Sequence, residues 1–250
     1  MQCIGAAGFA VLLLALGRWP VITLPLLLWG LLLAAIGAGS LMLLYRGLAL
    51  GPMAVVSPIG GAYAAVTVIL AVLFLGERLT PVQTVAVGVT FVGVLLASTD
   101  LRLLVATLGR PSPGVRVGFV AMLGFGFWGL FLALAVRSFD GLAIVLVGRF
   151  AGAALMLGAV LLRRAPPPSD RRPATMWLVL AVGVFDTVAN LSYVLGFEAG
   201  YASIVATAGA LYPVVTAGLA IVLLRERLAP NQYAGVGVLL LGLVGLGLAG

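Results

Sequence analysis

The sequence predicts an all-α membrane protein of about nine transmembrane helices arranged in two inverted repeats. Three observations support this fold class: 63% of the 250 residues are apolar, they lie in long runs, and the second half of the chain repeats the first. An average soluble domain is only about half apolar. The runs do not alternate with polar residues as the strands of a membrane barrel do, so helices are the expected spanning elements.

The apolar runs are long enough to cross a bilayer, whose hydrocarbon core of about 30 Å takes roughly 20 helical residues. Proline, glycine and arginine residues separate the runs. Nine helical segments are therefore predicted, at residues 4–17, 21–45, 52–75, 81–99, 115–137, 141–162, 174–197, 201–224 and 230–249.

An internal repeat relates the two halves of the chain at a constant offset of 149 residues. Residues 1–100 form the first repeat, 101–114 a linker and 115–250 the second repeat. The second repeat holds five predicted helices, and an odd number places two tandem repeats in opposite orientations across the membrane. The matched pairs are Gly47/Gly196, Gly51/Gly200, Gly60/Gly209, Tyr63/Tyr212, Thr67/Thr216, Glu77/Glu226, Arg78/Arg227, Pro81/Pro230, Gln83/Gln232, Gly88/Gly237 and Gly93/Gly242.

A charged motif recurs between apolar runs in both repeats, as "LGERLTP" and "LRERLAP". Each copy ends in a proline, which suits the first position of the following helix because its missing N–H costs nothing there. Thr80 can cap the helix after the first copy, whereas Ala229 cannot cap the helix after the second. We expect Glu77 and Glu226 to be turn and interface residues paired with arginine rather than substrate ligands.

These motifs and the runs around them resemble the EamA-type permeases of the drug/metabolite transporter superfamily. The resemblance rests on "GPMAVVSPIGGAYAAVTVILAVLFLGERLTPVQTVAVGVTFVG" and "YASIVATAGALYPVVTAGLAIVLLRERLAPNQYAGVGVLLLG", one from each half. It implies ten helices in two inverted five-helix bundles with a central cavity between them. It also implies movement of small metabolites, often outward, across a bacterial inner membrane.

The first repeat departs from the ten-helix pattern. Projected by the offset, Phe150 falls on Met1, so the predicted helix at 115–137 has no counterpart in the first repeat. Either the natural chain has nine helices, or the sequence begins downstream of its true start, which is the alternative we prefer. Without that helix one cavity wall is incomplete, so a non-transporting membrane scaffold or a truncated fragment is the alternative function.

Two charged residues lie deep inside predicted helices, where each costs about 2.5–3.5 kcal/mol on insertion scales. Arg149 is 13 residues from Leu162, roughly 20 Å along the helix, and Asp186 is 12 from Ala174, roughly 18 Å. The helices are consecutive, so the two charges reach the same depth and are expected to pair, with Asn190 one turn beyond Asp186. The pair is either a closed structural contact, or a cavity group that binds a zwitterionic substrate or exchanges partners during proton coupling.

Other polar and aromatic residues are candidates for the cavity wall. Gly148 and Gly152 flank Arg149 in a small-xxx-small pattern that favours close approach of the Arg149 and Asp186 helices. Tyrosines and threonines at matched positions of the repeats would face one cavity or serve in packing. These further substrate-binding candidates are Tyr63, Tyr212, Thr67, Thr216, Trp128 and Tyr193.

The charged residues exclude several other classes of protein. The net charge of +7 comes from 14 arginines lying mostly between the runs, which is a topology signal rather than a nucleic-acid surface. One cysteine and no histidine predict no metal site and no cofactor, and the lack of lysine excludes an ATP-binding P-loop. A membrane-embedded enzyme is disfavoured because no nucleophile stands beside a base. The expected partners are the lipid bilayer and a small polar metabolite, with protons and a homodimer as candidates.

Overall fold

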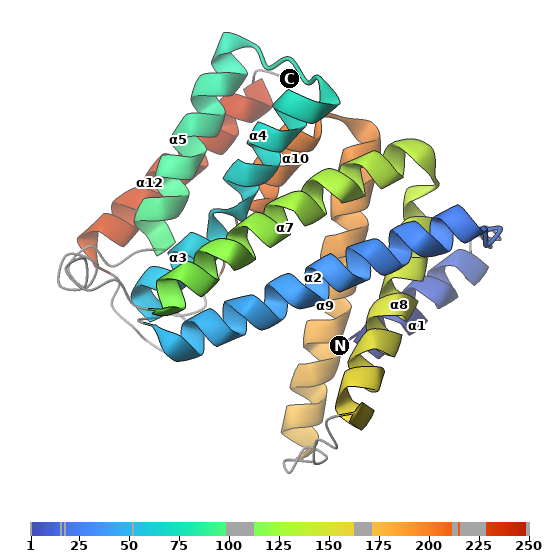
Figure 1. Cartoon of the computed structure of the whole chain (residues 1–250). Helices are drawn as coiled ribbons and strands as arrows, with labels where there is room; N and C mark the ends of the chain where they lie inside the picture. The colour runs from blue at the N-terminus through green and yellow to red at the C-terminus, as the bar shows by residue number, and fades with distance from the viewer. Residues whose placement is uncertain are drawn as a thin grey trace. The chain divides into compact units, whose positions relative to one another are not determined.

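The computed structural model describes residues 2–15, 17, 19–51, 53–98, 113–162, 172–211, 215 and 229–248. Within these residues every regular element is a helix (Figure 1), and seven helical spans are long and apolar enough to cross a membrane. The predicted all-α membrane fold is therefore confirmed. The helices are α1 (Gln2–Ala15), α2 (Leu24–Leu50), α3 (Met53–Gly61), α4 (Tyr63–Leu75), α5 (Pro81–Ser98), α7 (Pro113–Ser138), α8 (Gly141–Leu162), α9 (Pro173–Ala199), α10 (Ala202–Gly209) and α12 (Pro230–Leu248).

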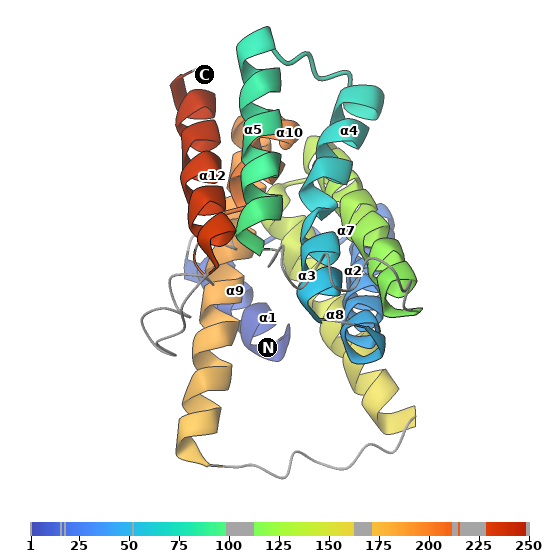
Figure 2. The same ribbon diagram turned by 90° about the vertical axis from the view of Figure 1, so that its left-hand side faces the viewer.

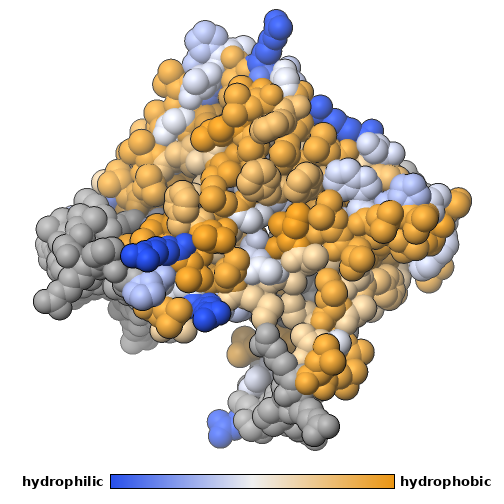
Figure 3. All heavy atoms as spheres, in the orientation of Figure 1, coloured by the Kyte–Doolittle hydropathy of each residue, from blue (hydrophilic) through white to orange (hydrophobic). Residues whose placement is uncertain are grey.

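The surface is dominated by hydrophobic side chains, as Figure 3 shows for one face. On α9, for example, the large side chains of Trp177, Leu178 and Phe185 are all exposed. A soluble protein rarely exposes apolar area on this scale, whereas a membrane helix presents it to lipid.

The chain divides into two compact units. Unit 1 comprises Met1–Ala38 and Phe131–Ala199, and unit 2 comprises Gly39–Leu130 and Gly200–Gly250. Each unit therefore contains helices from both predicted repeats, because a compact unit groups helices by contact and a repeat groups them by sequence. The repeat boundaries themselves stay a sequence prediction.

In unit 2, α5 and α12 lie side by side (Figure 2) and approach closely at glycines. A Cβ at Gly93 would overlap the backbone of Leu239, and one at Gly242 would overlap the backbone of Thr90. These two contacts exchange under the repeat offset of 149 residues, which carries Gly93 onto Gly242 and Thr90 onto Leu239. The two final helices of the repeats thus make one contact that is nearly symmetric.

The direction of these two helices follows from the same contacts. Along α5 the contact residues rise from Thr90 through Gly93 to Ala97, and along α12 their partners fall from Gly242 through Leu239 to Gly235. α5 and α12, one matched pair of helices, therefore run antiparallel. This is the arrangement that the odd helix number predicted for inverted repeats.

Two predicted helices differ in extent from the structure. The segment expected to end at residue 45 continues as α2 to Leu50, because Arg46 is exposed and need not end the helix. The segment expected at 52–75 is two helices, α3 and α4, separated at Ala62. Pro58 inside α3 has no N–H to donate and its ring crowds the preceding turn, so its effect falls before residue 58 rather than at Ala62.

A similar break ends α10 in the second repeat. Ala62 and Ala210 have almost the same backbone angles, φ −71° and ψ 3° against φ −69° and ψ 3°. Each amide is shared between the carbonyls three and four residues before it. The break at Ala62 projects to residue 211, which lies one residue from Ala210, where α10 ends.

The first charged motif is a well-capped turn in unit 2. α4 ends at Gly76 in the left-handed conformation, with φ +69°. The Thr80 hydroxyl accepts from the Gln83 amide at 3.2 Å, and Gln83 Oε1 accepts from the Thr80 amide at 2.9 Å. The predicted cap at Thr80 is confirmed and is a full capping box. In the second copy only one of these two bonds remains, in which Gln232 Oε1 accepts from the Ala229 amide.

Glu77 joins this turn to the second repeat. Its buried carboxylate accepts from the amides of Ala202 at 2.7 Å and Ser203 at 3.0 Å, and from the Ser203 hydroxyl. The first amides of a helix have no partner within that helix, so the carboxylate satisfies the start of α10. Glu77 is thus an interface residue, as predicted. Its repeat mate Glu226 lies outside the described residues.

Candidate functional site

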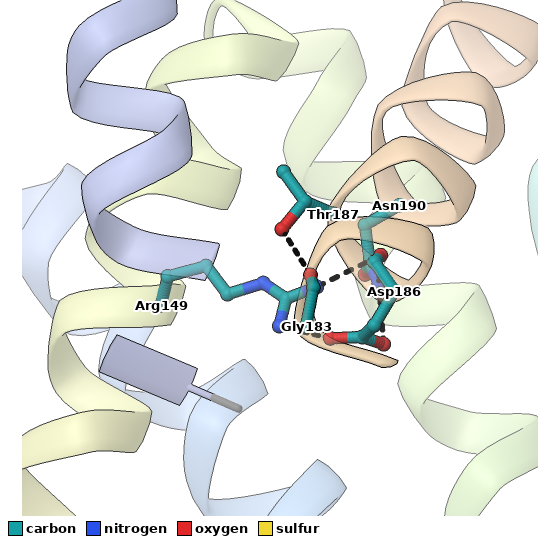
Figure 4. Close-up of polar contacts among 5 residues, drawn as sticks. All are labelled: Arg149, Gly183, Asp186, Thr187 and Asn190. Atoms are coloured by element: carbon teal, nitrogen blue, oxygen red, sulfur yellow. Dashed lines mark hydrogen bonds and ion pairs between the residues drawn. The ribbon is translucent and has the colours of Figure 1, made fainter. Parts of the chain in front are cut away.

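Arg149 and Asp186 form an ion pair between α8 and α9 of unit 1. Asp186 stands thirteen residues from each end of α9, and Arg149 stands eight residues from the start of α8. Arg149 Nη1 donates to Asp186 Oδ2, and Nη2 donates to the Asp186 backbone carbonyl at 3.2 Å (Figure 4). The pair predicted from helix depth is therefore present.

Asn190 completes this polar cluster from the next turn of α9. Its side-chain amide donates to the Asp186 carbonyl at 2.8 Å and to Asp186 Oδ1 at 3.3 Å. Asp186 thus receives donors from α8 and from its own helix, on both its side chain and its backbone (Figure 4). The neighbouring Thr187 hydroxyl donates to the Gly183 carbonyl and so satisfies itself locally.

α1 closes one side of the cluster, which the sequence did not reveal. A Cβ at Gly5 would lie only 3.0 Å from Arg149 Nη1 and 3.2 Å from Cζ, so the guanidinium packs on the bare backbone of α1. At Gly8 a Cβ would lie 3.4 Å from the Thr187 side chain. The three-residue spacing of Gly5 and Gly8 was the available signal, but glycines alone do not identify the helix they face.

The expectation for Gly148 is wrong. Gly148 lies against Gly30 of α2, where a Cβ on Gly30 would be 3.1 Å from the Gly148 amide nitrogen. Within 4 Å a Cβ on Gly148 would meet only the Gly30 carbonyl oxygen, at 3.9 Å, and no atom of α9. Gly148 therefore brings α2, rather than α9, close to α8.

The two charges of the pair differ in exposure. The Arg149 side chain is only 7% exposed, whereas the Asp186 side chain is 41% exposed. The cation is enclosed by its neighbours on α1, α8 and α9, and the anion is open on one side. Removing either charge would leave its partner uncompensated in an apolar segment, which is costly.

The remaining predicted site residues fall in both units. In unit 1, the Tyr193 ring packs against the Phe197 ring, with centroids 4.6 Å apart and the ring planes tilted by 52°. In unit 2, Tyr63 packs against Phe125 at 5.8 Å, and the buried Thr67 hydroxyl donates to the Tyr63 and Gly126 carbonyls, each at 3.3 Å. Trp128 is half-buried, and Tyr212 and Thr216 lie outside the described residues. A shared substrate site for all of them stays a prediction.

Thr67 shows how such a residue contributes to packing. A Cβ at Gly129 would meet the Thr67 side chain, so α7 and α4 approach closely at this point. With its hydroxyl bonded to two backbone carbonyls, Thr67 is a contact between helices.

Solved structures share the fold. Seventeen chains of known structure match. One of them is a crystal structure whose description, "Crystal structure of protein", gives no function. It is 18% identical, and the match covers 100% of this chain and 86% of that one with a TM-score of 0.77. At this identity the likeness speaks for the fold alone.

Comparison by sequence gives the family. None of the curated proteins matches the chain. The model of the EamA-like transporter family matches residues 1–99 and 112–248, which together are nearly the whole chain. The chain therefore belongs to the EamA-like transporter family, a family of multi-pass membrane transporters rather than enzymes.

Proposed function

We propose that the chain is a secondary active transporter that exports small polar metabolites, such as amino acids, by alternating access across a bacterial inner membrane. One observation carries the proposal: a member of a transporter family holds an arginine–aspartate pair at the middle of two apolar helices. Ionisable residues at that depth are expensive and usually mark a substrate or ion pathway.

The exposure of the pair favours a functional role over a purely structural one. A pair that served stability alone would be expected to bury both charges, yet the Asp186 side chain is open on one side. Replacing a buried pair by apolar residues is often neutral or stabilising, so stability is a weak reason to keep one. Because the chain has no lysine for a P-loop, an ion gradient would supply the energy, with protons as the proposed coupling ion.

Counterflow in proteoliposomes tests the proposal. Vesicles loaded with unlabelled amino acids should accumulate the labelled compound, and inside-out vesicles give the direction of transport. Asp186→Asn should abolish proton-dependent transport, and Arg149→Lys should reduce it because lysine cannot make the two-donor contact. The matched control is Asp140→Asn, since Asp140 caps the Ala143 amide at 3.0 Å and asparagine caps equally well.

Three outcomes count against this proposal. If Asp186→Asn keeps full transport and its proton dependence, the pair does not couple. If Arg149→Lys is silent, the two-donor geometry is irrelevant. If the purified chain shows no counterflow with any metabolite in the panel, the alternative of a non-transporting scaffold is supported.

A further inference from the structure

We infer that the Asp186 carboxylate is the charge this site offers to a substrate, so that the site selects molecules carrying a protonated amine. Arg149 is the positioning residue that holds the carboxylate in place. This inference rests on the proposed function, because it names the substrate class of the same site. It also reverses the role that an arginine would ordinarily suggest, which is recognition of a carboxylate.

The guanidinium is committed and enclosed. Nη1 and Nη2 both donate to Asp186, one to its side chain and one to its backbone. On α1, the backbone at Gly5 lies against the same guanidinium so closely that even a methyl group there would be tight. With 7% of the Arg149 side chain exposed, an anionic substrate would have to displace α1 or Asp186 to reach it.

The carboxylate, in contrast, has acceptor capacity left. An ionised carboxylate offers about four lone-pair positions. Among the described residues its donors are Arg149 on Oδ2 and Asn190 on Oδ1, the second at a long 3.3 Å. With 41% of the side chain exposed and lone pairs beyond those that these donors use, the carboxylate can accept further hydrogen bonds, as from an ammonium group.

The described residues of the three helices that form the cluster bring no further charge close to Asp186. The described residues of α1 carry no charged side chain, and α8 carries only Arg149. On α9 the other charged residue is Glu198, twelve residues from Asp186 and so roughly 18 Å along the helix. The charge within reach of a substrate at Asp186 is therefore the carboxylate's own, which attracts a cation and repels an anion.

Asn190 strengthens this assignment by its orientation. Its side-chain amide donates to the Asp186 carbonyl at 2.8 Å, a bond that fixes Asn190 on the same face of α9. The second bond, to Oδ1, orients the carboxylate from the side opposite Arg149 (Figure 4). The carboxylate is thus held between two donors, one on each of its oxygens.

Protection of Asp186 from a carbodiimide tests the inference. Dicyclohexylcarbodiimide reacts with the protonated form of carboxyl groups that it can reach within the membrane, so prolonged labelling draws on the small protonated fraction of Asp186, and mass spectrometry identifies the labelled residue. Putrescine and succinate serve as the probes, because each has a four-carbon chain and they carry opposite charges. We expect putrescine to protect Asp186 at a concentration at least about tenfold lower than succinate, which corresponds to one charge-assisted hydrogen bond.

Three variants keep the test interpretable. Asp140→Asn should leave Asp186 labelling and protection unchanged, because it alters a carboxylate outside the site. Asp186→Asn should remove the label from this position. If that variant does not fold, Asp186→Glu takes its place and should still be labelled. Arg149→Lys should retain protection by putrescine with the preference over succinate intact, since the positioning cation survives.

Each result bears on one of the two proposals. Preferential protection by putrescine supports the inference, even if counterflow then shows no transport. Equal or better protection by succinate overturns it, as does an Asp186 that does not react in the folded wild-type protein. Counterflow of carboxylates without amines would overturn the inference and leave the transporter proposal standing.

Discussion

At the residue scale, the polar side chains within the described helices satisfy themselves in two different ways. Thr67, Thr90 and Thr207 donate their hydroxyls to carbonyls one turn earlier on their own helices. Arg149 and Asp186 instead depend on each other across two helices. These hydroxyls can be satisfied within their own helix, although Thr67 also donates to Gly126 of α7, whereas each charge requires a partner helix, which is why the charged pair is the better candidate for function.

The charged pair could be predicted from the sequence, and its covering helix could not. A helix rises about 1.5 Å per residue, so counting from a shared loop gives depth without a structure. Asn190 followed because residues four apart share a helix face. Nothing comparable relates Gly5 to Arg149, since they are 144 residues apart and a glycine carries no chemical sign of its partner.

Gly5→Val tests whether α1 closes on the pair. The added side chain would press on the Arg149 guanidinium, so we expect a loss of about 1–3 kcal/mol, typical of overpacking, and reduced Asp186-dependent transport. Thermal unfolding of the purified protein and counterflow measure the two effects. Gly158→Val on α8 is the control, because a Cβ there meets nothing within 4 Å. Equal effects of the two variants would show that α1 does not press on Arg149.

At the element scale, helix ends and close helix contacts determine how unit 2 is assembled. A buried carboxylate, Glu77, satisfies the start of α10, and bare glycine backbone permits the contact of α5 with α12. The sequence predicted α5 and α12 as helices but did not predict the break at Ala62. Neither this break nor the similar one at Ala210 follows from its local sequence, because alanine is the strongest helix former and the position that matches Pro58 in the second repeat is Thr207.

The glycine contact predicts two matched pairs of variants. Gly93→Ala and Gly242→Ala each place a methyl group on backbone atoms of the facing helix, so each should cost at least about 2 kcal/mol. The costs should be similar, because the repeat offset exchanges the two contacts. Gly88→Ala and Gly237→Ala are also repeat mates, and a methyl group at either meets nothing within 4 Å. These controls should be neutral or stabilising by up to about 1 kcal/mol, as measured by thermal unfolding.

Glu77→Gln tests the cap of α10. Glutamine keeps one acceptor but presents an N–H group to an amide that needs an acceptor, so we expect a loss of about 1–3 kcal/mol. Glu198→Gln is the comparison, since Glu198 accepts from the Gly141 amide at 2.9 Å but is exposed, and water can replace it. Its cost should be below about 1 kcal/mol. Equal midpoints of unfolding for the two variants would contradict a special role for burial at Glu77.

At the scale of the whole molecule, the repeat is both the strongest sequence signal and the source of the architecture. Eleven matched pairs without a gap established the offset, and one antiparallel contact between α5 and α12 gives the orientation. The grouping into compact units did not follow from the repeat. Contacts such as Glu77 with Ala202 join residues of different repeats, and no local pattern in the sequence announces such contacts.

The antiparallel contact makes a prediction about membrane sidedness. α5 begins at Pro81 and α12 at Pro230, both exposed and related by the repeat offset, so antiparallel packing puts these two positions on opposite sides of the bilayer. In a Cys3→Ser background, Pro81→Cys and Pro230→Cys supply single thiols for a membrane-impermeant maleimide. One variant should react in intact cells, and the other only after the membrane is opened. Reaction of both from the same side would mean that the repeats are parallel, and the inverted architecture would then have to be abandoned together with the transport mechanism proposed for it.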